Sequence, residues 1–213
     1  GQVYWNSGGV WVRERQPDWN EMEYQMRNWY YFNWLCGDHI VEQHIHNIDV
    51  FNWAKQGHPV SAQGMGGREV RTGREHGEIF DHHFVEFTYE DGSIANSQCR
   101  HIKGCWNKVG EHLVGTKGRA DDTGAIYDLN GKVVWKHRDR DDPNPYQQEH
   151  DELFTAVDKG DYKFADAENG AHATMSSILG RMATYSGQVV TWDEAMSSDL
   201  VLMPPQSELS WEA

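Results

Sequence analysis

The chain has 213 residues, of which 19 are Lys or Arg and 33 are Asp or Glu, so its formal net charge is −14. Nucleic-acid binders use Lys and Arg to replace the counterions of phosphate, and this balance therefore argues against a nucleic-acid partner. The sequence shows no apolar run near the roughly 20 residues of a membrane-spanning helix, and no signal peptide at its start, so no membrane partner is expected.

The first part of the chain, up to about residue 58, has a helical pattern. Asp18 is placed to cap a helix over residues 19–35, and a second helix is expected over residues 38–56, ending at Gly57. The apolar positions of the second helix recur at spacings that predict one packed face. That face contains Ile40, Val41, Ile45, Ile48, Phe51 and Trp53.

The middle of the chain, residues 60–140, has the alternation of β-strands. Asp91-Gly92 and Asn130-Gly131 are two-residue turns between alternating segments, so each predicts a β-hairpin. Consecutive hairpins indicate a largely antiparallel sheet. The expected strands cover residues 60–71, 83–89, 93–100, 112–115, 125–129 and 132–136.

The last part of the chain returns to a helical pattern. A helix over residues 147–159 is expected to place Leu153, Phe154 and Val157 inward, and the longest helix is expected over residues 165–185. The remaining expected elements are a strand over residues 188–191, a helix beginning at Asp193 and an extended tail from Ser197 that includes Trp211.

This order of elements predicts an α+β fold in which one open, predominantly antiparallel sheet carries helices on one face. The chain has no internal repeat, so residues 1–213 are interpreted as one domain. Its three cysteines, Cys36, Cys99 and Cys105, lack a CxxC spacing and predict neither a disulfide framework nor a zinc site. The ten Trp residues suit cores, interfaces and sugar-binding faces alike.

The densest group of chemically active side chains lies in residues 38–49. On a continuous helix, Glu42, His46 and Asp49 share one stripe at positions i, i+4 and i+7, whereas His44 points away from it. A carboxylate one turn from an imidazole can orient the ring for general acid–base chemistry near neutral pH. A solvated polar helix face is the structural alternative for the same pattern.

A metal-binding site is the second functional interpretation of residues 38–49. Glu42, His44 and His46 have side chains that bind zinc or manganese, and His82-His83 could add a ligand from the sheet. The HExxH pattern is missing, and we assign no metal. Separately, Arg68 belongs to a small basic cluster that suits either an anionic substrate or surface ion pairs.

These residues resemble the C-terminal domain of the Gfo/Idh/MocA oxidoreductases, named for glucose–fructose oxidoreductase and inositol dehydrogenase. That family has the pattern D-x-x-x-H-x-x-D on a helix, and Glu42, His46 and Asp49 lie in the same register. The hairpin strands, the turn at residues 114–118 and the late helices follow in the order of that domain. The aromatic segment of residues 29–35 before Gly37 resembles an aromatic-rich bacterial branch of the family.

The resemblance implies a substrate-binding and oligomerisation domain whose N-terminal dinucleotide-binding domain is absent from this chain. The sequence contains neither a Gly-rich strand–turn–helix unit nor a Glu-Lys-Pro motif, and it begins at Gly1 rather than Met. We therefore expect a fragment that is inactive alone, from a parent protein that uses NAD or NADP. For the parent, a periplasmic location is one expectation and the cytoplasm is the other.

The resemblance also implies roles for individual residues. His46 would act as general acid or base on the hydroxyl of a sugar or polyol, Glu42 would polarise it, and Asp49 would support the helix. The residues expected to contact the substrate are His44, Trp29, Trp34, Tyr30 and Arg68. A homo-oligomer formed through the open sheet face is expected as well.

Two departures from the family pattern leave the reaction type open. Glu42 replaces the usual Asp, and His44 replaces a small residue. One alternative is a lyase or glycosidase that oxidises its substrate transiently on the same scaffold. The other is a domain that serves only oligomerisation or binding.

Overall fold

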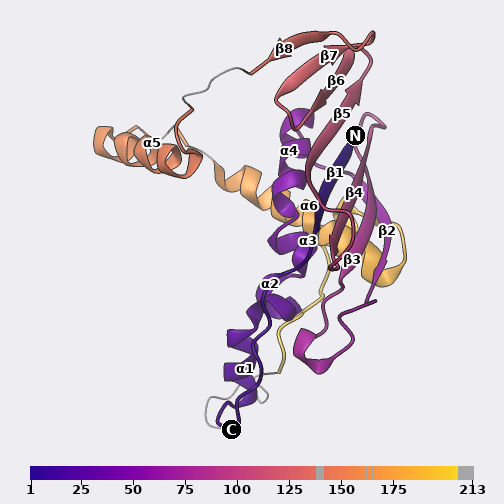
Figure 1. Cartoon of the computed structure of the whole chain (residues 1–213), viewed down its shortest axis with the longest axis vertical. Helices are drawn as coiled ribbons and strands as arrows, with labels where there is room; N and C mark the ends of the chain where they lie inside the picture. Colours follow the sequence, from indigo (N-terminus) through magenta and orange to yellow (C-terminus); the bar gives the residue numbers. More distant parts are fainter. Residues whose placement is uncertain (138–141, 162, 165, 206–213) are drawn as a thin grey trace.

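The structure is a computed structural model that describes residues 1–137, 142–161, 163–164 and 166–205. Its centre is a nine-stranded sheet in the order β8-β7-β6-β5-β1-β4-β3-β2-β9 (Figure 1). The strands are β1 (Gln2–Ser7), β2 (Ser61–Gly67), β3 (His82–Thr88), β4 (Ile94–His101), β5 (Lys108–Gly115), β6 (Gly118–Asp121), β7 (Ala125–Asp128), β8 (Val133–Lys136) and β9 (Val190–Thr191). The part of the predicted extended tail that contains Trp211 lies outside the described residues.

All strand pairs in the sheet are antiparallel except one. β1 runs parallel to β4, with Gln2 opposite Asn96, and antiparallel to β5 on its other side. The predicted hairpins β3–β4 and β7–β8 are present. The sequence did not predict β1 or β6, because it assigned a helical pattern to the first and a turn to the second.

One face of the sheet is covered by helices, as the sequence predicted. Figure 1 shows α3 (His39–Glu42), α4 (Ile45–Lys55) and α6 (Asp166–Ser186) on the same side, with α4 over β1 and β5 and α6 over β2 and β3. Gly180 allows a close approach of α6 to the sheet, since a Cβ there would lie 2.8 Å from the Phe87 ring. The main core therefore forms between these helices and the inward side chains of the sheet, and it includes Val3, Ile40, Ile48, Phe51, Val85, Phe87 and Leu179.

The helix predicted over residues 19–35 is divided into three short pieces: α1 (Glu21–Arg27), a 3₁₀ turn η1 (Trp29–Tyr31) and α2 (Asn33–Cys36). Asn20, not Asp18, is the N-cap, and its side chain accepts a hydrogen bond from the Glu23 N–H. The division follows from Asn28, which is fully buried and exchanges side-chain hydrogen bonds with the backbone of Arg13. These pieces enclose a second, aromatic-rich core.

The helix predicted over residues 38–56 is also interrupted. α3 ends at Glu42 and α4 begins at Ile45, and between them the His44 N–H bonds to the carbonyl of His39, five residues back. The side chain of His44 is fully buried and pairs with Ser97 of β4 at 2.7 Å. Glu42 and His46 therefore stand on two consecutive helices rather than on one continuous stripe.

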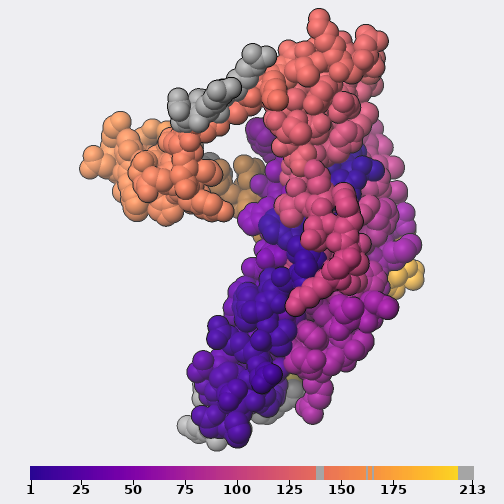
Figure 2. Space-filling model, viewed as in Figure 1, coloured from indigo at the N-terminus to yellow at the C-terminus, as the bar shows by residue number. Residues whose placement is uncertain are grey.

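The helix α5 (Pro145–Lys159) projects from the body of the molecule (Figure 2). The inward orientation expected for three of its apolar residues is wrong, because Leu153, Phe154 and Val157 are 47%, 65% and 69% exposed. Periodicity alone gave α5 an apolar face, but these three side chains of that face stay largely in contact with solvent. The last helix within the described residues is α7 (Trp192–Met196), whose N-cap is Thr191.

No helix within the described ranges combines the length and the apolar character needed to cross a bilayer.

Candidate functional site

A cleft runs between α4 and the first half of α6. Its volume is about 1020 Å³, and two of the three residues of the predicted stripe, His46 and Asp49, line it. The other lining residues come from α4, the following loop and α6. They are Ile45, Asn52, Trp53, Gln56, Gly57, His58, Asp166, Glu168, Asn169, Gly170, His172 and Ala173.

The imidazole of His46 is exposed, packs against an aromatic ring and interacts electrostatically with two carboxylates. Trp5 of β1 packs against it with ring centroids 5.8 Å apart. Burial raises the pKa of Glu42, and the Tyr30 hydroxyl and the His46 charge partly oppose that rise. Burial likewise raises the pKa of Asp49, opposed by His46. The predicted acid–imidazole group thus interacts electrostatically across the break between α3 and α4.

Hydrogen bonds fix α4 on the sheet and on α6. Asn47 donates to the Glu111 carboxylate of β5. Asn52 is buried and bonds on both sides, donating to the Ser176 hydroxyl at 3.0 Å and accepting from the Tyr89 hydroxyl at 2.7 Å. Because both asparagines sit on the buried side of α4, His46 is presented from a helix that cannot rotate freely.

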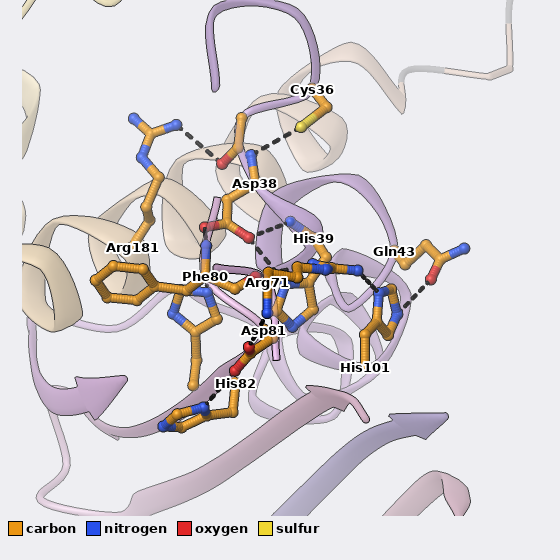
Figure 3. A network of polar contacts seen from close by, with 12 residues as sticks. Cys36, Asp38, His39, Gln43, Arg71, Phe80, Asp81, His82, His101 and Arg181 are labelled. Carbon is orange, nitrogen blue, oxygen red and sulfur yellow. Dashed lines mark hydrogen bonds and ion pairs between the residues drawn. The ribbon is translucent and has the colours of Figure 1, made fainter. Parts of the chain in front are cut away.

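Behind the break lies a buried polar network centred on Asp38 (Figure 3). Its carboxylate accepts hydrogen bonds from the His39 ring at 2.8 Å, the Phe80 N–H at 3.0 Å and the Tyr185 hydroxyl at 2.7 Å. Burial alone would raise the pKa of Asp38, but His83 and His39 outweigh it and hold that pKa well below its ordinary value. The network therefore stabilises an ionised carboxylate inside the protein.

Arg71 connects this network to the break between the helices. Its guanidinium, which can only donate, bonds to His101 Nδ1 at 2.7 Å, so the ring proton lies on Nε2. That Nε2 then donates to the Gln43 side-chain oxygen at 3.0 Å. Gln43 stands between α3 and α4, and the buried Arg71–His101 pair therefore holds the segment that separates Glu42 from His46 (Figure 3).

Asp81 places Arg71 in this position. One of its carboxylate oxygens accepts backbone hydrogen bonds from three successive residues, Glu69, Val70 and Arg71. Its other oxygen pairs with the His82 ring at 2.7 Å. Burial would raise the pKa of Asp81, but the Arg71 N–H, the His82 ring and the other two N–H donors outweigh it and lower that pKa.

Among the residues that the structure describes, Asp38, His39 and His83 are best placed to hold a metal, since their ligand atoms lie within 4.8 Å of one another. Both oxygens of Asp38 already accept hydrogen bonds, however, and the charge of Asp38 is felt by the buried Arg181 guanidinium. A divalent cation would have to displace those donors. The donor set favours a hydrogen-bonded network, and we propose no metal here.

The structure places the expected substrate-contacting residues away from this cleft. His44 is a buried core residue, and burial lowers its pKa to about 3. Tyr30 is 1% exposed, while Trp29 and Trp34 pack in the aromatic-rich core. Arg68 is exposed and donates to backbone carbonyls of its own loop.

Sequence reasoning missed the aromatic residue that does line the cleft. It placed Trp53 on the packed face of its helix, but Trp53 is 72% exposed. Its spacing of seven residues from His46 could have indicated the same face. His58 and His172 were also missed, because they approach the cleft from a loop and from α6.

The chain is similar in fold to solved structures of oxidoreductases. The aldose-aldose oxidoreductase of Caulobacter crescentus, solved with glycerol, is 14% identical with a TM-score of 0.65, over 89% of this chain and 54% of that one. The myo-inositol 2-dehydrogenase of Lactobacillus plantarum is 16% identical with a TM-score of 0.59, and the match covers 89% of this chain and 55% of that one. The scyllo-inositol dehydrogenase of Lactobacillus casei was solved with NAD(H) and scyllo-inositol. It is 14% identical with a TM-score of 0.61, and the match covers 90% of this chain and 56% of that one.

The chain therefore has the fold of the C-terminal domain of Gfo/Idh/MocA-type oxidoreductases, which confirms the fold expected from the resemblance. It spans about half the length of these structures. No protein-family model matches the chain, and no curated relative matches its sequence. The similarity thus defines the fold, and the chemistry has to be argued from the site.

Proposed function

We propose that this chain is the substrate-binding and catalytic half of an NAD(P)-dependent oxidoreductase that acts on a sugar, polyol or related hydroxyl compound. The observation that carries the proposal is the exposed imidazole of His46, which lines a cleft of this fold together with Asp49 and interacts electrostatically with the carboxylates of Glu42 and Asp49. Neighbours with the fold include a dehydrogenase solved with NAD(H) and a cyclic polyol.

His46 moves the proton in this proposal. Oxidation of an alcohol removes a proton from the hydroxyl and a hydride from its carbon, and a neutral imidazole can accept that proton through a ring nitrogen. Glu42 and Asp49 stabilise the resulting imidazolium, since both carboxylates interact with the His46 charge. In the reverse direction the same imidazolium returns the proton to the carbonyl oxygen.

The hydride partner comes from outside this chain. A nicotinamide ring supplies hydride transfer when it is bound, and the described residues contain no Gly-rich strand–turn–helix unit that would hold its pyrophosphate. We therefore assign no cofactor-binding residue here. The proposal places the cofactor on a separate dinucleotide-binding domain of the parent protein, against the α4–α6 side of this domain.

The proposal also includes self-association through the uncovered sheet face. Met65, Phe84, Gln98 and Tyr4 are cross-strand neighbours there, and Met65 and Phe84 are 71% and 38% exposed. Trp106 packs edge-on against Tyr4 and is itself 61% exposed. Exposed apolar rows of this kind suit burial against a second copy of the sheet.

The test is a His46→Ala substitution in the full-length natural protein, assayed with NAD and NADP against a panel of sugars and inositols. Loss of a general acid–base group should lower kcat by about 10²- to 10⁴-fold. His150→Ala is the matched control, because His150 is exposed on α5 and lies away from the cleft.

Accumulation of reduced nicotinamide, lost in the His46 variant and retained in the control, would support the proposal. Turnover that continues unchanged after His46→Ala would remove it. Product formation without net reduction of the cofactor would instead indicate the lyase or glycosidase chemistry.

A further inference from the structure

The junction between α3 and α4 consists of Gln43 and His44, and its backbone departs from the regular α-helical pattern. The His39 carbonyl accepts hydrogen bonds from the N–H groups of both residues, each at 3.1 Å, so the chain makes one wide turn there. The next turn is tight, because the His46 and Asn47 N–H groups bond to carbonyls three residues back. Wide, π-type turns within helices are rare and recur at functional sites. Backbone regularity therefore does not explain this junction, and its side chains have to hold it.

Both junction residues are anchored to the same strand of the sheet. The His44 ring pairs with the Ser97 hydroxyl at 2.7 Å, and the Gln43 side-chain oxygen accepts from His101 Nε2 at 3.0 Å. Ser97 and His101 are buried and belong to β4, a strand in the interior of the sheet. The junction is therefore held on a rigid part of the fold.

The hydrogen bond between His101 and Gln43 has a fixed direction. His101 Nδ1 faces the Arg71 guanidinium, which only donates, so the ring proton is on Nε2 and needs an acceptor. Among the described residues that acceptor is the Gln43 side-chain oxygen. A side chain without an acceptor at position 43 would leave a buried N–H unpaired, which is unfavourable. The Gln43 side chain is therefore held in one orientation.

The same junction separates two residues of the proposed reaction, Glu42 at the end of α3 and His46 in the first turn of α4. Each helix is fixed by its own contacts, α3 through the fully buried Ile40 and α4 through the hydrogen bonds of the buried Asn52. The relative placement of the two helices is therefore decided at the junction. The interaction of the Glu42 carboxylate with the His46 imidazole depends on that placement.

We propose that Gln43 is a positioning residue of the site. Through its hydrogen bond to His101 it holds the junction on β4 and so keeps Glu42 in place beside His46, while the Gln43 side chain itself points at the sheet. Arg71 takes part indirectly, because it fixes the proton of His101 on Nε2. This inference rests on the proposed function and adds a residue outside the cleft to its machinery.

The test compares two substitutions of Gln43 in the full-length protein with its cofactor. Gln43→Met keeps the length of the side chain but replaces the oxygen by a weakly accepting thioether, whereas Gln43→Glu retains an oxygen acceptor. The kcat of Gln43→Met should fall about 10- to 100-fold with KM changed less than about twofold, since small misplacements of reacting groups cost rate. Gln43→Glu should recover kcat to within about threefold of wild type. Gln147→Met, on exposed α5, is the matched control and should leave both constants unchanged.

Wild-type turnover by Gln43→Met would overturn the positioning role while the oxidoreductase proposal stands. A loss of kcat of the same size in Gln43→Glu would also overturn it, because the acceptor would then not be the cause.

If the wild-type protein oxidises no sugar, the proposed function fails, and hydrogen exchange of the backbone amides tests the anchoring alone. The amides of residues 43–46 should exchange at least about tenfold faster in Gln43→Met, and at the wild-type rate in Gln43→Glu and Gln147→Met. Equal exchange rates in Gln43→Met and wild type would overturn the anchoring.

Discussion

Three buried imidazoles make the stability of this fold depend on pH. Burial lowers the pKa of His39, His44 and His101 from the ordinary 6.5 to about 4, about 3 and about 2. Below pH 6.5 the unfolded chain binds protons at these sites that the folded chain does not bind. Their contribution to stability is therefore complete above pH 6.5 and is lost as the pH falls toward the folded pKa values.

The size of the effect follows from the unfolded pKa. At about pH 5.5 each imidazole is about nine-tenths protonated in the unfolded chain, which lowers the free energy of unfolding by about 1.4 kcal/mol relative to about pH 8. All three folded pKa values lie well below 5.5, so the change of about 1.4 kcal/mol per imidazole barely depends on them. Together the three groups lower the free energy of unfolding by about 4 kcal/mol, a large part of the roughly 5–15 kcal/mol typical of a domain.

Urea unfolding followed by Trp fluorescence at the two pH values measures this difference. His44→Asn should reduce the difference by about 1.4 kcal/mol, since it removes one of the three groups. His150→Asn should leave it unchanged, because His150 is in contact with water in both states. A wild-type difference below about 1 kcal/mol would refute the reasoning for the whole group.

Two further predictions concern packing and assembly. Asn52→Ala should lower the free energy of unfolding by about 2 kcal/mol, because the buried hydroxyls of Tyr89 and Ser176 each lose a partner; denaturation curves measure it. Phe84→Ser should shift the mass in light scattering toward the monomer, whereas Phe154→Ser on α5 should not, since only Phe84 lies on the uncovered sheet face.

Each of these two predictions would be contradicted by a specific result. An Asn52→Ala protein as stable as wild type would show that α4 is held by apolar packing alone. A wild-type protein that is monomeric at all concentrations, or a Phe84→Ser protein whose mass is unchanged, would remove the sheet face as the assembly surface.

Local signals account for the parts of the fold that the sequence predicted. The turns Asp91-Gly92 and Asn130-Gly131 specify hairpins within a few residues of themselves, so β3–β4 and β7–β8 could be read directly. β1 could not, because its partners β4 and β5 lie more than ninety and more than a hundred residues away, respectively, and its own segment carries no turn signal.

The candidate site could be predicted from the sequence only where it depends on neighbouring residues. Glu42, His46 and Asp49 are close in sequence, and their electrostatic grouping survives the break at Gln43 and His44. The buried network was not predicted, because Asp38 meets its partners through long-range packing. Those partners include Phe80, His83 and Tyr185, from elements distant in the chain.

The central position of β1 has a consequence for synthesis of the protein. Four strands lie on each side of it, so a sheet without these six residues would separate into two four-stranded halves. During translation the segment emerges well before both β4 and β5, and it must wait unpaired until the ribosome has produced them. A chaperone that shields Val3 and Trp5 over that interval would find its binding site only in the nascent chain, since in the finished fold Val3 is buried in the core and Trp5 packs against it.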